Sequence, residues 1–368
     1  MGSEMCIRDR RMKAAFFDEH GDLSKLQVGD QPDPEPGPDD VRIHVKACAL
    51  NHLDLFVREG WPGLKLDLPH IGGTDLVGVV ESVGANVRDV AVGDEVIVNP
   101  GLNFHTGPDG EQVIPPEPFI VGENRAGGLA QLCVVPATHV LPKPDGVSWE
   151  EAACLPLTLQ TAFQMLRRAG LAQTGTDLAH LLRHDAARPA EGKRVLVIGG
   201  GGGVSVMAIQ LAKALGAWVC TTTGGPDKVA KVEALGADHV LDYKADPAWS
   251  KAAFLASEKQ GYNVVIDSVG AATWAHSLRC LKAGGRLVTC GATTGPIGET
   301  HIQLVFWKQL QIIGSTMGTH EDLARALAFV EAGAVRPIVD SVWSLDEARD
   351  AQARMEAGEM FGKIVVRP

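Results

Sequence analysis

The sequence predicts an α/β protein with two domains, one β-rich and one built on a doubly wound parallel sheet. Its 368 residues, 45% of them hydrophobic, exceed what a single compact core usually takes. Short β-like runs separated by Gly and Pro fill the first part of the chain, whereas strand-like and helix-like segments alternate from Arg194 to about Ser315. Such alternation is typical of a parallel sheet that helices cover on both faces.

The β-rich domain is expected over residues 12–160. Its strands are predicted at the apolar runs 41–50, 75–84, 94–100 and 132–141. Turn-forming residues separate these runs, which favours a barrel-like arrangement. Residues 1–11 show no apolar period, and we expect them to be a leader outside the fold.

A helix is expected to leave this domain at Ser148, because Ser148 and Glu151 have the spacing of a capping box. The polar stretch 173–193 then reads as a linker or a short helical insertion. The second domain is expected over residues 161–315. The last part of the chain, 316–368, ends in a strand-like run and is expected to return to the β-rich domain and complete it.

A run of glycines between an apolar strand and an amphipathic helix predicts a dinucleotide site. The spacing GxGxxG falls on Gly200, Gly202 and Ser205, with serine where a small residue lets helix and strand pack. A pyrophosphate needs backbone N–H groups at a helix N-terminus and a backbone without side chains. A flexible linker is the alternative, but the flanking strand and helix favour a Rossmann domain. The expected cofactor contacts are Gly200, Gly202, Gly203, Val204 and Ser205.

The end of the second strand bears on the choice between NAD and NADP. An acidic residue there would bind the ribose of NAD and repel the extra phosphate of NADP, but Thr223 is neutral. Lys228 offers a cation nearby, and Tyr243 is placed to contact the adenosine end. These residues favour NADP, although Lys228 could equally be a solvated surface charge and Asp227 argues for NAD.

Two further segments follow strands of the predicted parallel sheet. Val269 and Gly270 come after one strand, and Gly291 and Ala292 after the next. Ligands gather at the carboxyl edge of such sheets. We therefore expect these four residues to shape the nicotinamide pocket.

Composition excludes several classes of protein. The net charge of −11 argues against binding to nucleic acid or to an anionic membrane surface. No apolar run reaches the roughly 18 residues of a membrane span, and no secretion signal is evident, so a cytoplasmic location is expected. Seven cysteines without a close pair argue against a disulfide framework or a zinc knuckle.

Four motifs carry a resemblance to the medium-chain dehydrogenase/reductase superfamily over residues 12–368. They are PHIGGTDLVGVVESVG at 69–84, VGDEVIVNP at 92–100, GGVSVMAIQLAKALGA at 202–217 and FGKIVVRP at 361–368. The resemblance implies a GroES-like catalytic domain, a Rossmann domain, and an active site in the cleft between them.

Many members of this superfamily hold a catalytic zinc through a cysteine, a histidine and a third ligand. The matching positions here are Asn51, Thr74 and Leu157, which are poor zinc ligands. The region that carries four structural-zinc cysteines in some relatives has none. We therefore expect no metal, the alternative being a stray site made from His52, Asp54, Asp75 or His105.

The segment ALNHLD at 49–54 is similar to that of the zinc-free branch of NADPH:quinone oxidoreductases and enoyl reductases. The resemblance implies hydride transfer from NADPH to a small apolar quinone or α,β-unsaturated carbonyl. It assigns Asn51 a hydrogen bond to ribose or acceptor oxygen and places Thr161 against the nicotinamide. His52 is a candidate proton donor, although a packed histidine is the plainer interpretation.

Two other functions stay open at this stage: an alcohol dehydrogenase or ketone reductase of the same superfamily, and a protein that binds NADPH without turnover. A homodimer or homotetramer is expected, since the apolar run 304–314 near the end of the predicted sheet is suited to extending it.

Overall fold

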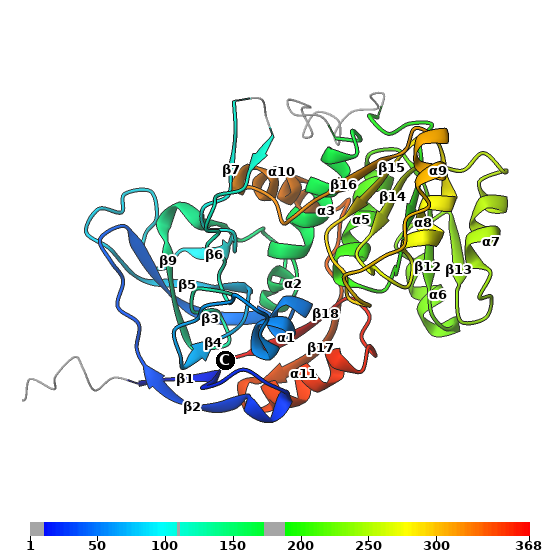
Figure 1. The fold of residues 1–368 in the computed structure, drawn as a ribbon. Helices are drawn as coiled ribbons and strands as arrows, with labels where there is room; N and C mark the ends of the chain where they lie inside the picture. The colour runs from blue at the N-terminus through cyan, green and yellow to red at the C-terminus, as the bar shows by residue number, and fades with distance from the viewer. Residues whose placement is uncertain (1–10, 109–110, 173–187) are drawn as a thin grey trace, which may run out of the picture. The chain divides into compact units, whose positions relative to one another are not determined.

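The structure is a computed structural model that describes residues 11–108, 111–172 and 188–368 (Figure 1). Its contacts divide the chain into two compact units. Of the described residues, the first unit contains 11–107, Gln112–Leu157 and Val339–Pro368, and the second contains 108, 111 and those within Thr158–Ile338. Most of the expected insertion, and the expected leader up to residue 10, lie outside the described residues. Arg11, which we expected in the leader, already belongs to the first strand.

Antiparallel pairing dominates the first unit, as the β-rich pattern predicts. A small sheet has the order β2-β1-β4, and the main sheet has the order β10-β6-β5-β3-β18-β17, with β9 also on β3. The strands are β1 (Arg11–Phe17), β2 (Gln27–Pro32), β3 (Asp40–Ala49), β4 (His70–Ile71), β5 (Asp75–Val83), β6 (Glu95–Val98), β9 (Leu132–Pro136), β10 (Val140–Pro142), β17 (Val339–Ser344) and β18 (Lys363–Arg367). A separate pair joins β7 (His105–Thr106) to β8 (Gln112–Val113). The last strand therefore does return to this sheet, where it pairs with β3.

Strand β3 builds one core of the first unit and leads to its polar site. Val41, Ile43 and Val45 are buried while His44 is exposed, as the two-residue period of a strand requires. The buried side chains pack against β5, β6 and β9. Where the chain leaves β3, Leu50 N donates to Ile364 O on β18 at 2.9 Å.

The helices of this unit are α1 (His52–Glu59), α2 (Trp149–Ala153) and α11 (Ala348–Glu356), and α3 (Pro156–Arg168) continues into the second unit. Capping boxes precede two helices of this unit, α1 and α2. The predicted capping box is confirmed at α2: Ser148 N donates to Glu151 Oε2 at 2.9 Å, and Glu151 N donates to Ser148 Oγ at 3.2 Å. Ala351 and Met355 of α11 belong to the same apolar cluster as Leu50.

The second unit is a parallel sheet in the order β13-β12-β11-β14-β15-β16. Its strands are β11 (Arg194–Val197), β12 (Trp218–Thr223), β13 (His239–Asp242), β14 (Tyr262–Asp267), β15 (Leu281–Thr289) and β16 (Gln311–Gly314). Its helices are α5 (Gly203–Ala214), α6 (Pro226–Glu233), α7 (Trp249–Ala256), α8 (Trp274–Cys280), α9 (Ile302–Trp307) and α10 (His320–Glu331). The strand order reverses between β11 and β14, so the predicted doubly wound Rossmann sheet is confirmed, with its switch point beside the glycine run.

Helix α10 joins the second unit, whereas we expected all of 316–368 in the first. The reason is its packing on α3. The rings of Phe163 and Phe329 lie 6.3 Å apart, and Arg167 Nε is 3.3 Å from the carboxylate of Asp322. Only 339–368 therefore rejoin the β-rich unit. In the described ranges, none of the helices has the length and apolar character that a membrane crossing requires.

Candidate functional site

The glycine run between β11 and α5 is drawn tightly against the end of β12. Gly200 N donates to Thr222 O at 2.7 Å, and Gly199 N donates to Thr222 Oγ1 at 3.1 Å. A Cβ atom on Gly200 would lie 2.5 Å from Thr221 Oγ1. A side chain has no room at Gly200, so the turn presents bare backbone.

The N-terminus of α5 is suited to an anion. Gly202 is its N-cap and supplies no capping side chain, while Gly203 and Val204 form the first turn. Ser205 is buried, and its Oγ donates to Ile198 O at 2.9 Å. Ser205 therefore fastens the helix to the strand end, and the backbone N–H groups ahead of it fit a pyrophosphate.

The loops after β12 and β13 meet beside this turn. Thr223 is buried, and its carbonyl accepts a hydrogen bond of 3.0 Å from the backbone of the exposed Tyr243. Lys228 lies in the first turns of α6. Sequence reasoning missed Asp242, whose Oδ1 accepts from Gly225 N at 3.0 Å; this bond is the chief cause that lowers the pKa of Asp242. An anionic group therefore bonds to the N-cap of the helix that carries Lys228.

The residues predicted at the carboxyl edge of β14 and β15 come together. A Cβ atom on Gly270 would lie 2.7 Å from Ala292 Cα, and one on Gly291 would lie 3.0 Å from Ser268 O. Val269 Cγ2 is 3.3 Å from the Cβ position of Gly199, so this group adjoins the glycine turn. Sequence reasoning missed Asp267, whose carboxylate shapes the loop by accepting from the backbone N–H groups of Val269 and Gly270, at 2.8 and 3.2 Å.

Thr161 lies on α3 and is only 4% exposed. Among the described residues its Oγ1 has no hydrogen-bond partner, and neither has the side-chain amide of Gln160 beside it. Buried polar atoms without partners are uncommon in folded proteins. A ligand that bonds to them would explain both.

In the first unit, Asn51 lies at the centre of a buried polar cluster, where it caps α1. Its Nδ2 donates to Asp75 Oδ2 at 2.9 Å, and its Oδ1 accepts from Lys363 Nζ at 2.5 Å. Lys363 Nζ also lies 2.9 Å from Asp75 Oδ2. Each of the three side chains thus holds the other two, and the two charges compensate one another.

Two carboxylates connect the three positions that correspond to zinc ligands in many relatives. Asp75 Oδ1 accepts from Leu157 N at 2.7 Å. Asp54 Oδ2 accepts from Asn51 N at 2.6 Å, and Asp54 Oδ1 accepts from Thr74 Oγ1 at 3.3 Å. Burial raises the pKa of Asp54 to about 6, although the Asn51 N–H favours its charged form.

His52 is the first residue of α1 and is half-buried. Burial lowers the pKa of its imidazole, and the nearby Lys363 charge acts in the same direction. Its ring centroid lies 6.4 Å from that of Phe56. His52 is therefore a neutral, packed imidazole at pH 7.

The donor groups at this position do not fit a zinc ion. Asn51 is an amide already bonded to a carboxylate and an ammonium, Thr74 is a hydroxyl, and Leu157 has no donor in its side chain. Burial raises the pKa of the nearby Cys48 thiol well above its usual range, which opposes a thiolate ligand. The described part of the chain contains no group of three His, Cys, Asp or Glu side chains placed to hold a metal.

Comparison with known proteins agrees with this fold. The family model of the alcohol dehydrogenase GroES-like domain matches residues 37–145, and that of the zinc-binding dehydrogenase matches residues 203–332. An alcohol dehydrogenase of Geobacillus stearothermophilus is 32% identical over 97% of this chain and 99% of its own. The acryloyl-coenzyme A reductase of Sulfurisphaera tokodaii is 30% identical over 95% and 98%, and a quinone oxidoreductase of Pseudomonas aeruginosa is 29% identical over 97% and 99%.

Solved structures of related enzymes have the same fold. A crystal structure of an NAD-dependent alcohol dehydrogenase superposes with a TM-score of 0.88 at 39% identity, covering 97% of this chain and all of that one. A 2-octenoyl-CoA carboxylase reductase in complex with NADP and 2-octenoyl-CoA gives 0.82 at 29% identity, covering 97% and 87%. The chain therefore belongs to the medium-chain dehydrogenase/reductase superfamily and is an NAD(P)H-dependent oxidoreductase.

Proposed function

We propose that this oxidoreductase transfers a hydride from NADPH to a small apolar quinone or α,β-unsaturated carbonyl without a catalytic zinc. The observation that carries the proposal is the cluster at Asn51. An amide held by the Asp75–Lys363 ion pair stands where many members of the superfamily have metal ligands. Such a cluster can donate a hydrogen bond to the acceptor oxygen, but it cannot act as a Lewis acid.

The class of acceptor follows from the charge that develops during the reaction. Reduction of a simple ketone concentrates negative charge on one oxygen, and a metal normally stabilises that charge by several kcal/mol. A quinone or enone spreads the charge by resonance, so a positioned N–H donor suffices. Bound NADPH supplies the hydride at C4 of its nicotinamide. The similarity to proteins named acryloyl-coenzyme A reductase and quinone oxidoreductase supports this choice.

We assign the other residues to binding and orienting the cofactor. We assign the pyrophosphate to the backbone from Gly200 to Val204, with Ser205 fixing the helix behind it. We assign the sides of the nicotinamide pocket to Val269, Gly270, Gly291 and Ala292. The unpartnered Oγ1 of Thr161 supports a ligand contact there. Because His52 is neutral at pH 7, solvent is the simpler proton source.

We also propose that the protein prefers NADPH to NADH. The neutral Thr223 and the cation Lys228 support NADPH, whereas Asp227 and Asp242 weaken it. Relatives differ in the same way, since one solved structure contains NADP and another is named NAD-dependent. We place the extra phosphate at Lys228 and the adenine near Tyr243.

A substrate panel with both cofactors tests the proposal. We expect the purified protein to oxidise NADPH with naphthoquinones or 2-alkenals, and to show little activity with cyclohexanone or with simple alcohols in reverse. The dialysed protein should contain less than 0.1 equivalent of zinc, as an order-of-magnitude bound for an adventitious metal. Activity restricted to simple ketones and alcohols, with one zinc per chain, would establish the rival alcohol dehydrogenase function. Tight NADPH binding without any turnover would establish a binding protein instead.

We also propose that the protein forms a homodimer or homotetramer through the second unit. Strand β16 is the last strand in the sheet order, and one of its edges is unpaired within the described ranges. The helix before it exposes Ile302, Phe306 and Trp307, at 74%, 63% and 80%. An apolar patch beside a free strand edge is typical of an interface with a second copy of the same chain.

A further inference from the structure

We propose that Lys363 is a positioning residue that fixes the orientation of the Asn51 amide, so that this position offers a substrate an N–H donor and no acceptor. The inference rests on the proposed function, because it concerns the same acceptor oxygen. Lys363 comes from the last strand of the chain, and its effect on the amide determines which ligands the site selects.

The charges around the amide permit one orientation. An ammonium group only donates hydrogen bonds, and a carboxylate only accepts them. Asn51 Oδ1 faces Lys363 Nζ at 2.5 Å, and its Nδ2 faces Asp75 Oδ2 at 2.9 Å. A flipped amide would place its oxygen against the carboxylate and its N–H groups against the ammonium. Both contacts would then be repulsive.

One N–H of the amide remains for a ligand. Nδ2 carries two hydrogens, and one of them bonds to Asp75. The other has no partner among the described residues. Because Lys363 withdraws electron density at Oδ1, the remaining N–H is a stronger donor than that of a free amide. A carbonyl or enolate oxygen matches this donor. A hydroxyl group that needs an acceptor finds none on Asn51.

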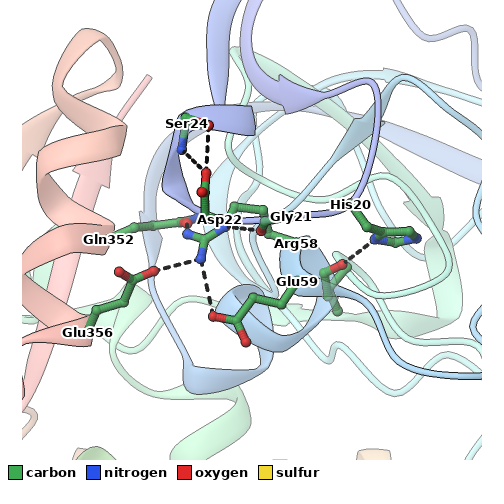
Figure 2. A network of polar contacts seen from close by, with 9 residues as sticks. His20, Gly21, Asp22, Ser24, Arg58, Glu59, Gln352 and Glu356 are labelled. Carbon is green, nitrogen blue, oxygen red and sulfur yellow. Dashed lines mark hydrogen bonds and ion pairs between the residues drawn. The ribbon is translucent and has the colours of Figure 1, made fainter.

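The backbone around both residues is rigidly connected. Leu50 N donates to Ile364 O at 2.9 Å, so the residue before Asn51 is bonded to the residue after Lys363. The far end of α1 is held as well, as Figure 2 shows. Arg58, only 1% exposed, donates to Gln352 Oε1 and Glu356 Oε1 on α11, both at 2.6 Å. The same C-terminal segment thus holds α1 at its last turn and supplies the lysine that contacts its N-cap, Asn51.

The test compares two kinds of ligand at the same position. Dissociation constants are measured with NADP⁺ present, which cannot reduce the enone, for an enone and for the corresponding saturated alcohol. In the Lys363→Met variant Oδ1 loses its ammonium partner and Asp75 alone still orients the amide, and we expect the preference for the enone over the alcohol to fall about tenfold. Lys363→Arg keeps a donor and should recover most of the preference. Arg367→Gln, at the exposed end of the same strand, is the control and should leave it unchanged.

Turnover provides a second readout through a double-mutant cycle. We expect Lys363→Met to lower kcat/KM about tenfold or more, and Asn51→Ala to lower it by at least as much. The double variant should be no worse than Asn51→Ala, within about twofold, because the lysine acts through the amide. The NADPH dissociation constant should change less than about threefold in all variants. Losses that multiply, or an unchanged ligand preference in Lys363→Met, would overturn the inference.

Folding is controlled by removing both charges together. Asp75→Asn with Lys363→Met removes both charges of the ion pair, and the orientation of Asn51 is then no longer imposed. This variant should unfold within a few degrees of the wild type, yet show a preference reduced at least as much as in Lys363→Met. If the wild type reduces no conjugated carbonyl, the proposed function fails, but the ligand preferences still test the role of Lys363 because they require binding alone.

Discussion

Asp75 and Lys363 form an ion pair of 2.9 Å although 288 residues separate them in the chain, and their side chains are 0% and 3% exposed. Each group is the first residue of its strand, β5 or β18. A charge removed from water this completely is tolerated only with a partner. The pair therefore joins β5 to the last strand of the chain as well as holding Asn51.

Removing one partner should be costly. We expect Asp75→Asn to lower the free energy of unfolding by about 3–5 kcal/mol, because it takes from the buried Lys363 ammonium the carboxylate that it contacts. Glu150→Gln is the control, since it removes the partner of the exposed Arg367 and should cost less than about 1 kcal/mol. Urea unfolding at pH 7 measures both. Equally small losses of unfolding free energy in the two variants would show that the buried pair stabilises the fold no more than the exposed pair does.

Asp54 should make stability depend on pH. Its pKa is raised to about 6 by burial, above the ordinary value of 3.8, so the folded state binds this proton more tightly than the unfolded chain. The contribution of Asp54 to stability is then fully present below about pH 4 and is lost as pH rises through about 6. The loss amounts to about 3 kcal/mol at most.

The comparison with Asp54→Asn isolates this effect. We expect the stability of the wild type relative to the variant to fall between pH 4 and pH 6 and to stay level above about pH 7. Urea unfolding at a series of pH values measures it. A difference that rises over this interval would mean that the hydrogen bonds from Asn51 and Gly73 outweigh burial.

Much of the fold could be predicted from the sequence because its signals are local. The strand and helix periods of the second unit, the glycine turn and the capping box at Ser148 each depend on residues within one or two elements. The packing role expected of Ser205 is also local, since Ser205 and Ile198 lie on either side of the same glycine turn. The likeness to one superfamily supplied the positions of Asn51 and Thr161.

The rest depends on contacts that no local pattern encodes. Lys363 lies 312 residues from Asn51, and the motif FGKIVVRP indicates only a last strand. Asp242 acts through a backbone N–H in another loop, at Gly225. Helix α10 was assigned to the wrong unit because its amphipathic pattern does not identify α3 as its partner.

Lys228 should distinguish the two cofactors. If its side chain binds the extra phosphate, Lys228→Ala should weaken NADPH binding about tenfold and NADH binding less than about twofold, since a charge-assisted contact of this kind contributes about 1.5 kcal/mol or more. Fluorescence titration of each cofactor measures this. Lys231→Ala, one turn along α6, is the control. Equal losses for both cofactors in Lys228→Ala would remove the phosphate contact from the proposal.

The proposed interface on the second unit should be sensitive to charge. Trp307 is 80% exposed on the helix that precedes the edge strand β16, and an interface there would bury it. A carboxylate at this position would have to be desolvated, which costs several kcal/mol without a partner. We therefore expect Trp307→Glu to shift the protein from dimer or tetramer toward monomer in sedimentation velocity. Leu255→Glu, an exposed change on α7, is the matched control and should leave the assembly intact. A wild type that sediments as a monomer at micromolar concentration would disprove the interface directly.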